Sequence, residues 1–219
     1  RYDIPLHIDG GEILPGKKGL EAAARDARYA FLRSLPGKIA TAHTADDNAE
    51  TVLMHLIRGT GLKGLGGIAA KRGNLIRPLL SVTRKEVLAF LDEYSLSHRE
   101  DSMNATDIVL RNRIRHHVMP LMKAENPKFS ENISAMALRL RQDEDALLHM
   151  AESHGVISIT ALRSESSAIR ARVLERFLKE SGVREPEAQH IRLAESLVFS
   201  DNPSAKGNFP GGITIGRHY

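Results

Sequence analysis

The order of short apolar stretches and amphipathic stretches along the chain is the feature that most restricts its fold. Residues 38–43 (KIATAH) indicate a short buried strand, and residues 45–58 have the apolar spacing of a helix. A second strand is predicted over residues 74–80, and a second helix begins after Thr83. An order of strand, helix, strand and helix is typical of an α/β fold. We therefore predict an α/β domain built on a parallel sheet.

Both predicted helices begin at a pair of residues with the spacing of a capping box. Thr44 precedes Asp47 in the first helix, and Thr83 precedes Glu86 in the second, each by three residues. In such a box the hydroxyl accepts a hydrogen bond from a backbone N–H of the first turn, and the acid accepts one from the cap. The second helix has four side chains that we expect to face inward: Val87, Leu88, Leu91 and Tyr94.

The rest of the chain is predicted to be mainly helical. Its first residues (RYDIPLHI) indicate the end of a strand already inside a domain, and without an initial Met we expect a fragment. Residues 1–127 are predicted to form the α/β domain and residues 128–219 a small, mainly helical domain. The other expected elements are helices over residues 20–35, 108–121, 130–153, 167–181 and 186–199, and a hairpin with a Pro-Gly-Gly turn over residues 207–219.

Composition excludes several classes of protein. Of the 219 residues, 42% are hydrophobic and 26% are charged, which is sufficient for a folded core. No cysteine is present, which excludes disulfides, cysteine-ligated zinc and cysteine catalysis. No apolar run is long enough to cross a membrane, and we expect a cytoplasmic protein. The net charge of +4 permits an RNA partner but fits ordinary surface charge as well.

Four polar side chains lie where the first strand meets the first helix: His43, Asp46, Asp47 and Glu50. The carboxyl end of a strand, where His43 lies, is the edge at which open α/β sheets bind ligands. Glu50 follows Asp47 by three residues and Asp46 by four, so the three acids share one helix face and repel one another. A cation, either Mg²⁺ or a substrate ammonium group, would relieve that repulsion. The alternative is that the acids only stabilise the positive end of the helix dipole, although one carboxylate would suffice for that.

A glycine-rich segment follows the first helix. It runs from Arg58 to Gly67 and includes Gly59, Gly61 and Lys63. Glycines allow a backbone to approach a phosphate or a ribose closely, and the basic side chains suit the same ligand. A flexible connector is the alternative interpretation.

The predicted helix over residues 108–121 is basic. Arg111 and Arg115 are four residues apart and share a helix face, so the pair has the geometry to bind a phosphate. A solvated basic helix is the alternative. The same cluster contains Arg113, His116 and His117, and three residues are close enough in sequence to orient the arginines: Glu100, Asp101 and Asn104.

Taken in order, these segments resemble one family, the tRNA(Ile)-lysidine synthetases. HTADDNAET resembles that family's H-x-x-D-D-x-x-E-T motif, and RGTGLKGLGGI resembles the loop that follows it. RPLLSVTRKEV is similar to R-P-L-L followed by R-x-E, EDSMN to E-D-x-S/T-N, and RNRIRHHVMP to R-N-x-[IL]-R…P. The ordered motifs cover residues 21–127, and together they are far more specific than any one alone. Beyond residue 130 the match is looser and resembles the family's small tRNA-contacting domain.

The resemblance implies a nucleotide alpha-hydrolase-like (PP-loop ATPase) domain, incomplete at its N-terminus. It implies that ATP adenylates the C2 oxygen of the wobble cytidine in tRNA(Ile) with a CAU anticodon. The ε-amine of L-lysine then displaces AMP and forms lysidine. The implied cofactors are ATP and Mg²⁺, the implied partners are tRNA(Ile) and L-lysine, and a homodimer is possible.

The resemblance also implies roles for individual residues. The catalytic residues would be His43, Asp46, Asp47, Glu50 and Arg111, with Asp46 and Asp47 at the metal. Asp47 and Glu50 would hold the ammonium groups of lysine. The other substrate-binding residues would be Arg58, Gly59, Gly61, Lys63, Arg77, Asn104, Arg113 and Arg115.

Some departures from the family pattern matter. The S-G-G-x-D-S loop that grips ATP would lie ahead of Arg1, so we expect this chain alone to be inactive. The larger C-terminal domain of many members is also absent, Met103 stands where Ser or Thr is usual, and Asn48 stands where Gln is common. Two alternative functions remain: another PP-loop tRNA-modifying enzyme, which the lack of cysteine opposes for a thiolase, and a non-catalytic tRNA-binding module.

Overall fold

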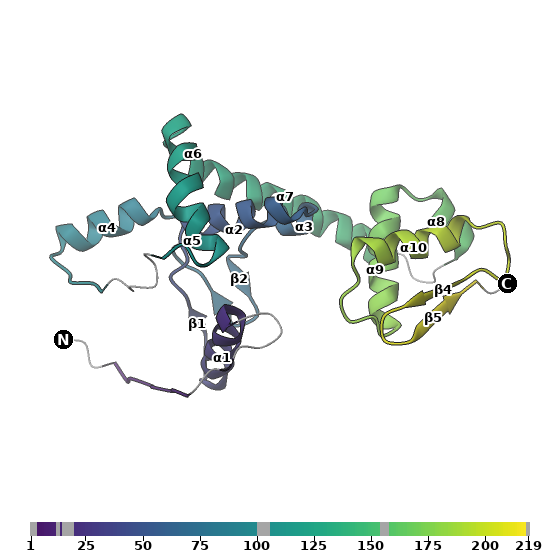
Figure 1. Ribbon diagram of the computed structural model, residues 1–219, viewed down its shortest axis with the longest axis horizontal. Coiled ribbons are helices and arrows are strands. Elements are labelled where there is room, and N and C mark those ends of the chain that lie inside the picture. The colour runs from purple at the N-terminus through teal and green to yellow at the C-terminus, as the bar shows by residue number, and fades with distance from the viewer. Residues whose placement is uncertain (1–3, 12–13, 15–19, 100–105, 154–157, 218–219) are drawn as a thin grey trace. The chain divides into compact units, whose positions relative to one another are not determined.

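A computed structural model describes residues 4–11, 14, 20–99, 106–153 and 158–217 (Figure 1). These described residues form two compact units. The first takes those that fall within residues 1–59 and 67–135, and the second takes those within residues 60–66 and 136–219. The division between the units falls within helix α7 (Phe129–Glu152). The domain boundary predicted between residues 127 and 128 stays a prediction.

The sheet of unit 1 combines a parallel and an antiparallel pair. Strand β1 (Ile39–Ala40) lies parallel to β3 (Leu75–Ile76), which confirms the predicted parallel arrangement. Strand β2 (Lys71–Arg72) pairs with the other edge of β3 in the antiparallel direction, which the sequence analysis missed. The strand predicted over residues 74–80 is shorter than expected, because Pro78 has no N–H to donate and turns follow it.

Two helices of unit 1, those that follow Thr44 and Thr83, begin where the capping residues predicted. Helix α1 (Leu20–Ser34) precedes β1, helix α2 (Ala45–Arg58) follows it, and helix α4 (Arg84–Glu93) follows β3. Thr44 and Thr83 each form a complete capping box. Both boxes are therefore confirmed, and they set the orientation of the first turn of each helix.

The apolar side of α4 is not buried as expected. Leu88 is 44% exposed and Tyr94 is 59% exposed, while Val87 and Leu91 are half-buried. The prediction that these four side chains face inward is wrong, because no buried residue of the described core lies on α4.

The strand expected at the start of the chain is also not formed in the described residues. Ile4, Leu6 and Ile8 lie in irregular backbone, and all three side chains are exposed. A strand needs a partner for its N–H and C=O groups, and the described residues provide none for this segment.

The basic segment contains a wider turn than the sequence predicted. One helix was expected over residues 108–121, but helix α5 (Leu110–Arg113) is followed by a π-helix, η2 (Ile114–Val118), and then by α6 (Met119–Glu125). Figure 1 shows this segment beside α2. The core between them contains Ala49, Ile114 and Met119, with Leu53, Met54, Leu110, Val118, Phe129 and Ile133 packed against it.

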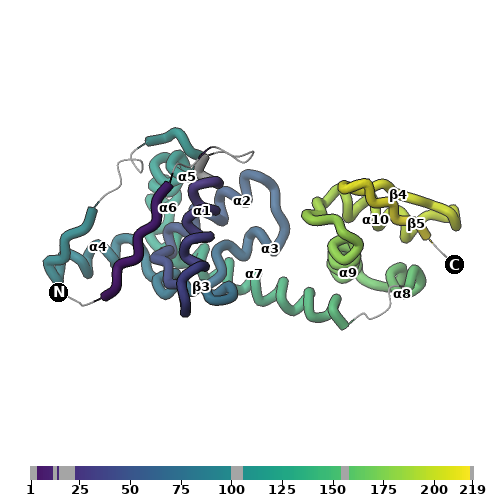
Figure 2. The backbone as a smooth tube through the Cα atoms, turned by 90° about the horizontal axis from the view of Figure 1, so that it is seen from below, coloured from purple at the N-terminus to yellow at the C-terminus, as the bar shows by residue number. Residues whose placement is uncertain are grey.

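Unit 2 is mainly helical, as predicted. It contains most of α7, the short helices α3 (Leu62–Leu65) and α8 (Ile159–Ser164), and the predicted helices α9 (Ser167–Glu180) and α10 (Ala188–Phe199). Figure 2 shows α10 beside the terminal hairpin of β4 (Lys206–Phe209) and β5 (Ile213–Gly216), which is antiparallel as expected. Gly211 and Gly212 form the hairpin turn with positive φ. Among the described helices none is long and apolar enough to span a bilayer.

Candidate functional site

The candidate site lies at the carboxyl edge of the parallel strands, where β1 leads into α2. His43 follows β1, and Nδ1 of its ring is 2.9 Å from the hydroxyl of Thr41. Burial lowers the pKa of His43, and Arg77 and Arg111 lower it further against the opposing effect of Asp47. The imidazole is therefore uncharged at neutral pH.

Asp46 joins four segments of unit 1 through one carboxylate. Its Oδ2 accepts a hydrogen bond of 2.6 Å from the backbone N–H of Arg84 at the start of α4. Its Oδ1 accepts hydrogen bonds from Lys123 Nζ on α6, at 2.5 Å, and from Ser130 Oγ on α7, at 2.7 Å. Burial raises the pKa of Asp46, but the hydrogen bonds from Lys123, Arg84 and Ser130 outweigh it and hold the pKa below its usual value. Asp46 is thus a charged, fully bonded centre of the fold.

Asp47 and Glu50 bind two arginines of the basic segment. Arg111 donates from Nε to Glu50 Oε2 at 2.8 Å and from Nη2 to Asp47 Oδ1 at 3.0 Å. Arg115 donates from Nε to Glu50 Oε1 at 2.7 Å and from Nη2 to Glu50 Oε2 at 2.9 Å. The other oxygen of Asp47 caps α2 through the backbone N–H and hydroxyl of Thr44. One acid therefore serves both the helix cap and the site.

The protein itself supplies cations to the acid cluster. Lys123 is paired with Asp46, while Arg111 and Arg115 are paired with Asp47 and Glu50. Hydrogen bonds to Glu50, opposed by burial and aided by the charges of the acids, raise the pKa of Arg115 above its usual value. The repulsion inferred from the spacing is thus relieved within the described residues, without an external cation.

The π-helix explains how one segment provides a row of side chains to this cluster. Arg111, Arg115, Met119 and Lys123 follow one another at intervals of four residues. In an α-helix each step of four residues overshoots a full turn by about 40°. A π turn holds more residues, so a step of four residues falls short of a full turn. The π-helix η2 therefore offsets part of the rotation that the four-residue steps accumulate in the α-helical parts. All four side chains can therefore contact α2 or the space beside it.

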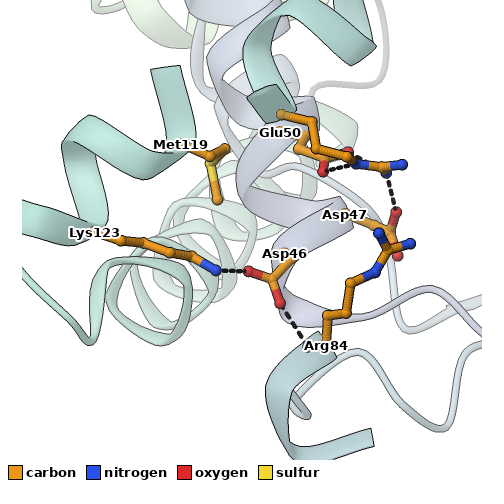
Figure 3. A pocket seen from close by; sticks show the side chains of 7 residues that line it. Asp46, Asp47, Glu50, Arg84, Met119 and Lys123 are labelled. Carbon is orange, nitrogen blue, oxygen red and sulfur yellow. Dashed lines mark hydrogen bonds and ion pairs between the residues drawn. The ribbon is translucent and has the colours of Figure 1, made fainter. Parts of the chain in front are cut away.

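A small cavity opens beside the acids. Figure 3 shows Lys123 and the start of α4 at Arg84 approaching Asp46 from different sides. The cavity has a volume of about 90 Å³. Its lining combines acids, bases and one apolar side chain: Asp46, Asp47, Glu50, Arg84, Arg115, Met119 and Lys123.

Several residues predicted to bind substrate lie outside this cluster. Arg113 donates to the backbone carbonyls of Asp107 and Ile108, and Arg77 donates to the carbonyl of Ala69. Lys63 belongs to unit 2 and lies 3.5 Å from Glu175. The structure therefore unites Asp47, Glu50, Arg111 and Arg115, whereas the side chains of Arg77 and Arg113 donate to backbone carbonyls elsewhere in unit 1.

The remaining predicted positions are on the surface or outside the described residues. Arg58 and Gly59 end α2 and are exposed, and Gly61 precedes α3. His116 and His117 both bond to the carboxylate of Asp107, at 2.7 and 2.6 Å. The predictions for three residues fall outside the described residues: Glu100, Asp101 and Asn104.

No site role was predicted for Arg84, Ser130 or Lys123, although Arg84 stands in the RPLLSVTRKEV motif. Lys123 continues the four-residue spacing of Arg111 and Arg115, and that repeat was a usable signal. Arg84 and Ser130 reach Asp46 only through the folding of α4 and α7. No local pattern connects them with an acid so far away in the chain.

Comparison with known proteins gives a consistent result for both parts of the chain. A family model described as the PP-loop domain matches residues 1–122, and one described as the TilS substrate binding domain matches residues 157–219. The tRNA(Ile)-lysidine synthase of Geobacter sulfurreducens is 34% identical over 243 residues, which cover 100% of this chain and 52% of that protein.

Two other relatives carry the same name. That of Bacillus thuringiensis subsp. konkukian is 33% identical, covering 91% of this chain and 47% of the relative. That of Parabacteroides distasonis is 40% identical, covering 68% of this chain and 36% of the relative. The chain thus spans about half the length of the first two relatives. It belongs to the PP-loop family, and its resemblance to the tRNA(Ile)-lysidine synthases is confirmed.

Proposed function

We propose that this chain carries part of the active site of an ATP-dependent ligase that joins L-lysine to the wobble cytidine of tRNA(Ile). The observation that carries the proposal is the network in which Arg111 and Arg115 bind Asp47 and Glu50 at the carboxyl edge of the parallel strands. It unites two of the ordered sequence motifs in one place. The family match and the names of the relatives support the same reaction.

The network has the components that such a ligation requires. Lysine carries two ammonium groups, and Asp47 and Glu50 are the acids suited to bind them. The adenylated cytidine carries a phosphate, for which the guanidinium groups of Arg111 and Arg115 are suited. We propose that substrate binding exchanges these internal ion pairs for pairs with substrate. The ammonium groups of lysine would replace the arginines at the acids, and the ε-ammonium would pass a proton to one of these carboxylates. The neutral amine would then form the bond to C2 as the C2–O bond to AMP breaks, and the freed arginines would neutralise the departing phosphate.

ATP and Mg²⁺ are part of the proposal. Bound Mg²⁺ would neutralise charge on the ATP phosphates. Within the described residues no group of three or more acids or histidines is arranged to hold a metal ion. Asp46 and Asp47, the two acids predicted at the metal, each have both oxygens bonded to donors of the protein. The partners of Asp47 Oδ1 are Arg111 and Arg115, which we propose to exchange on substrate binding, so we favour Asp47. A cytoplasmic location and a homodimer stay predictions.

The experiment that tests the function uses this chain extended at its N-terminus with the family's S-G-G-x-D-S segment. Release of AMP is measured with ATP, Mg²⁺ and tRNA(Ile) carrying a CAU anticodon, with and without L-lysine. We expect AMP release that depends on lysine and tRNA. Turnover that does not depend on lysine would exclude the ligase, and tRNA binding without turnover would favour the non-catalytic module.

A further inference from the structure

Arg84 differs from the other cations that line the cavity. Lys123 is paired with Asp46, and Arg115 is paired with Asp47 and Glu50. The side chain of Arg84 is exposed and forms no ion pair with any residue that the structure describes. Among the described residues that line the cavity, Arg84 is therefore a cation without an ion-pair partner in the described part of the chain.

The backbone of Arg84 is held in place although its guanidinium is not paired. Its N–H donates to Asp46 Oδ2 at 2.6 Å, and Thr83 caps the helix that it begins. The side chain therefore starts from a defined point beside the cavity, and Figure 3 shows it extending from the first turn of α4. A guanidinium anchored in this way is suited to bind a planar oxyanion with two parallel hydrogen bonds.

The other lining residues narrow the choice of oxyanion. Asp47 and Glu50 are acids that suit an ammonium group, and Met119 provides an apolar surface for methylenes. The volume of about 90 Å³ is far below the 300–1,000 Å³ typical of sites for larger ligands, so the cavity suits part of an amino acid and not a nucleotide. In an amino acid the α-ammonium and the carboxylate are attached to the same carbon. That arrangement matches a small cavity lined by the acids Asp47 and Glu50 and by the guanidinium of Arg84.

We infer that Arg84 binds the α-carboxylate of the lysine substrate and so selects a free amino acid over other amines. This inference rests on the proposed function. It assigns a specificity role to the arginine of the R-x-E pattern in RPLLSVTRKEV, for which the resemblance implied no role.

The test compares L-lysine with L-lysinamide, in which a neutral amide replaces the carboxylate. The extended chain is used, and kcat/KM is measured for each amine from AMP release. In Arg84→Ala we expect kcat/KM for lysine to fall by roughly 10- to 100-fold, because a hydrogen-bonded charge pair is lost, with little change for lysinamide. Arg84→Lys keeps the positive charge but loses the planar, forked guanidinium. Its kcat/KM for lysine should therefore lie between the values for the unsubstituted chain and for Arg84→Ala. Lys85→Ala is the matched control, since Lys85 is exposed on the same turn and does not line the cavity.

Two results would overturn the inference. An equal loss for lysine and lysinamide would remove any role with the carboxylate. A slower formation of the adenylated tRNA in the absence of lysine, or a higher KM for ATP, would assign Arg84 to a phosphate instead.

Calorimetric titration separates this inference from the proposed function. Binding of lysine and of lysinamide is measured without tRNA, for the unsubstituted protein and for Arg84→Ala. Loss of the preference for lysine in the variant supports the role of Arg84 even if turnover fails for another reason. If the original protein shows no such preference, the inference is wrong whether or not the ligase proposal holds.

Discussion

Glu50 and Asp46 are adjacent on the surface of α2, yet their carboxylates have different partners. Glu50 has a side chain that is only 3% exposed, and both its oxygens accept hydrogen bonds from arginines of the basic segment. Asp46 is bonded to Lys123, Ser130 and the backbone of α4. The first arrangement can exchange partners with a charged substrate, whereas the second connects segments of the fold.

Substitution of Glu50 tests the first arrangement. In Glu50→Gln the charge that attracts an ammonium group is lost, so we expect the KM for lysine to rise by roughly 10-fold or more, and the KM for ATP to rise less. Steady-state kinetics of the extended chain measure both values. Asp107→Asn is the control, because Asp107 pairs with two histidines outside the cavity. Equal increases in both KM values would contradict a lysine-binding role.

Substitution of Asp46 tests the second arrangement. Asp46→Ala leaves Lys123, Ser130 and the N–H of Arg84 without their acceptor, so we expect the free energy of unfolding to fall by about 2–4 kcal/mol. Urea denaturation measures this loss. Asp92→Ala, an exposed acid on α4, should change the free energy by less than about 0.5 kcal/mol. A loss as small as that of the control would show that Asp46 does not hold these segments together.

At the scale of elements, α2 is connected to its neighbours through polar contacts as well as through its apolar face. The amide of Asn48 accepts a hydrogen bond from the backbone N–H of Ile68 at 2.7 Å and donates to Ser134 at 3.2 Å. Gly67 lies against the same amide, with φ of 60°. A Cβ added at Gly67 would be 2.3 Å from Asn48 Oδ1, which is too close for the contact to remain.

Two glycines separate the effect of crowding from the effect of backbone strain. Gly67→Ala and Gly73→Ala both place a side chain at positive φ, which costs about 1–2 kcal/mol. Only at Gly67 does the new Cβ meet other atoms, since nothing lies within 4 Å at Gly73. We expect Gly67→Ala to lower the free energy of unfolding by about 1–3 kcal/mol more than Gly73→Ala. If urea denaturation gives equal losses of unfolding free energy for the two variants, Asn48 moves away from the new Cβ without a measurable loss of stability.

At the scale of the whole molecule, buried titratable groups make stability depend on pH. Because the pKa of Asp46 is depressed, its stabilisation is complete above its unfolded value of 3.8 and is lost as the pH falls through the lower folded value. The pKa of His43 is also depressed, so below its unfolded value of 6.5 the unfolded state takes up a proton that the folded state does not. Stability should therefore decline first below pH 6.5 and again below pH 3.8.

The contribution of His43 can be isolated with a neutral replacement. We expect His43→Gln to flatten the dependence of the unfolding free energy on pH in the range below 6.5, because the pKa of His43 is lower in the folded state and the substitution removes that protonation difference. Urea denaturation across this range measures the slope. His98→Gln, which replaces a histidine at an exposed position, is the control for the substitution itself. An unaltered slope in His43→Gln would mean that other groups cause the acid sensitivity.

Local chemistry explains which parts of the fold were predictable. A capping box needs only residues three apart, so Thr44 and Thr83 predicted the starts of α2 and α4 correctly. The hairpin turn at Gly211 and Gly212 was predictable for the same reason. The strand expected at the start of the chain and the inward side of α4 were predicted wrongly, because burial depends on which distant segment covers a surface. The π-helix was missed because ordinary helix-forming residues occupy it.

The sequence by itself determined the order of β1, α2, β3 and α4, the first turns of α2 and α4, and the charged residues that α2 and the basic segment bring to the candidate site. Those features depend on residues that are at most a few positions apart. Only the tertiary structure decided the partners of the acids: two arginines for Glu50, and Lys123, Ser130 and the backbone of α4 for Asp46. The physical reason is that a carboxylate removed from water takes whichever donors packing brings within hydrogen-bonding distance, and packing joins residues far apart in the chain.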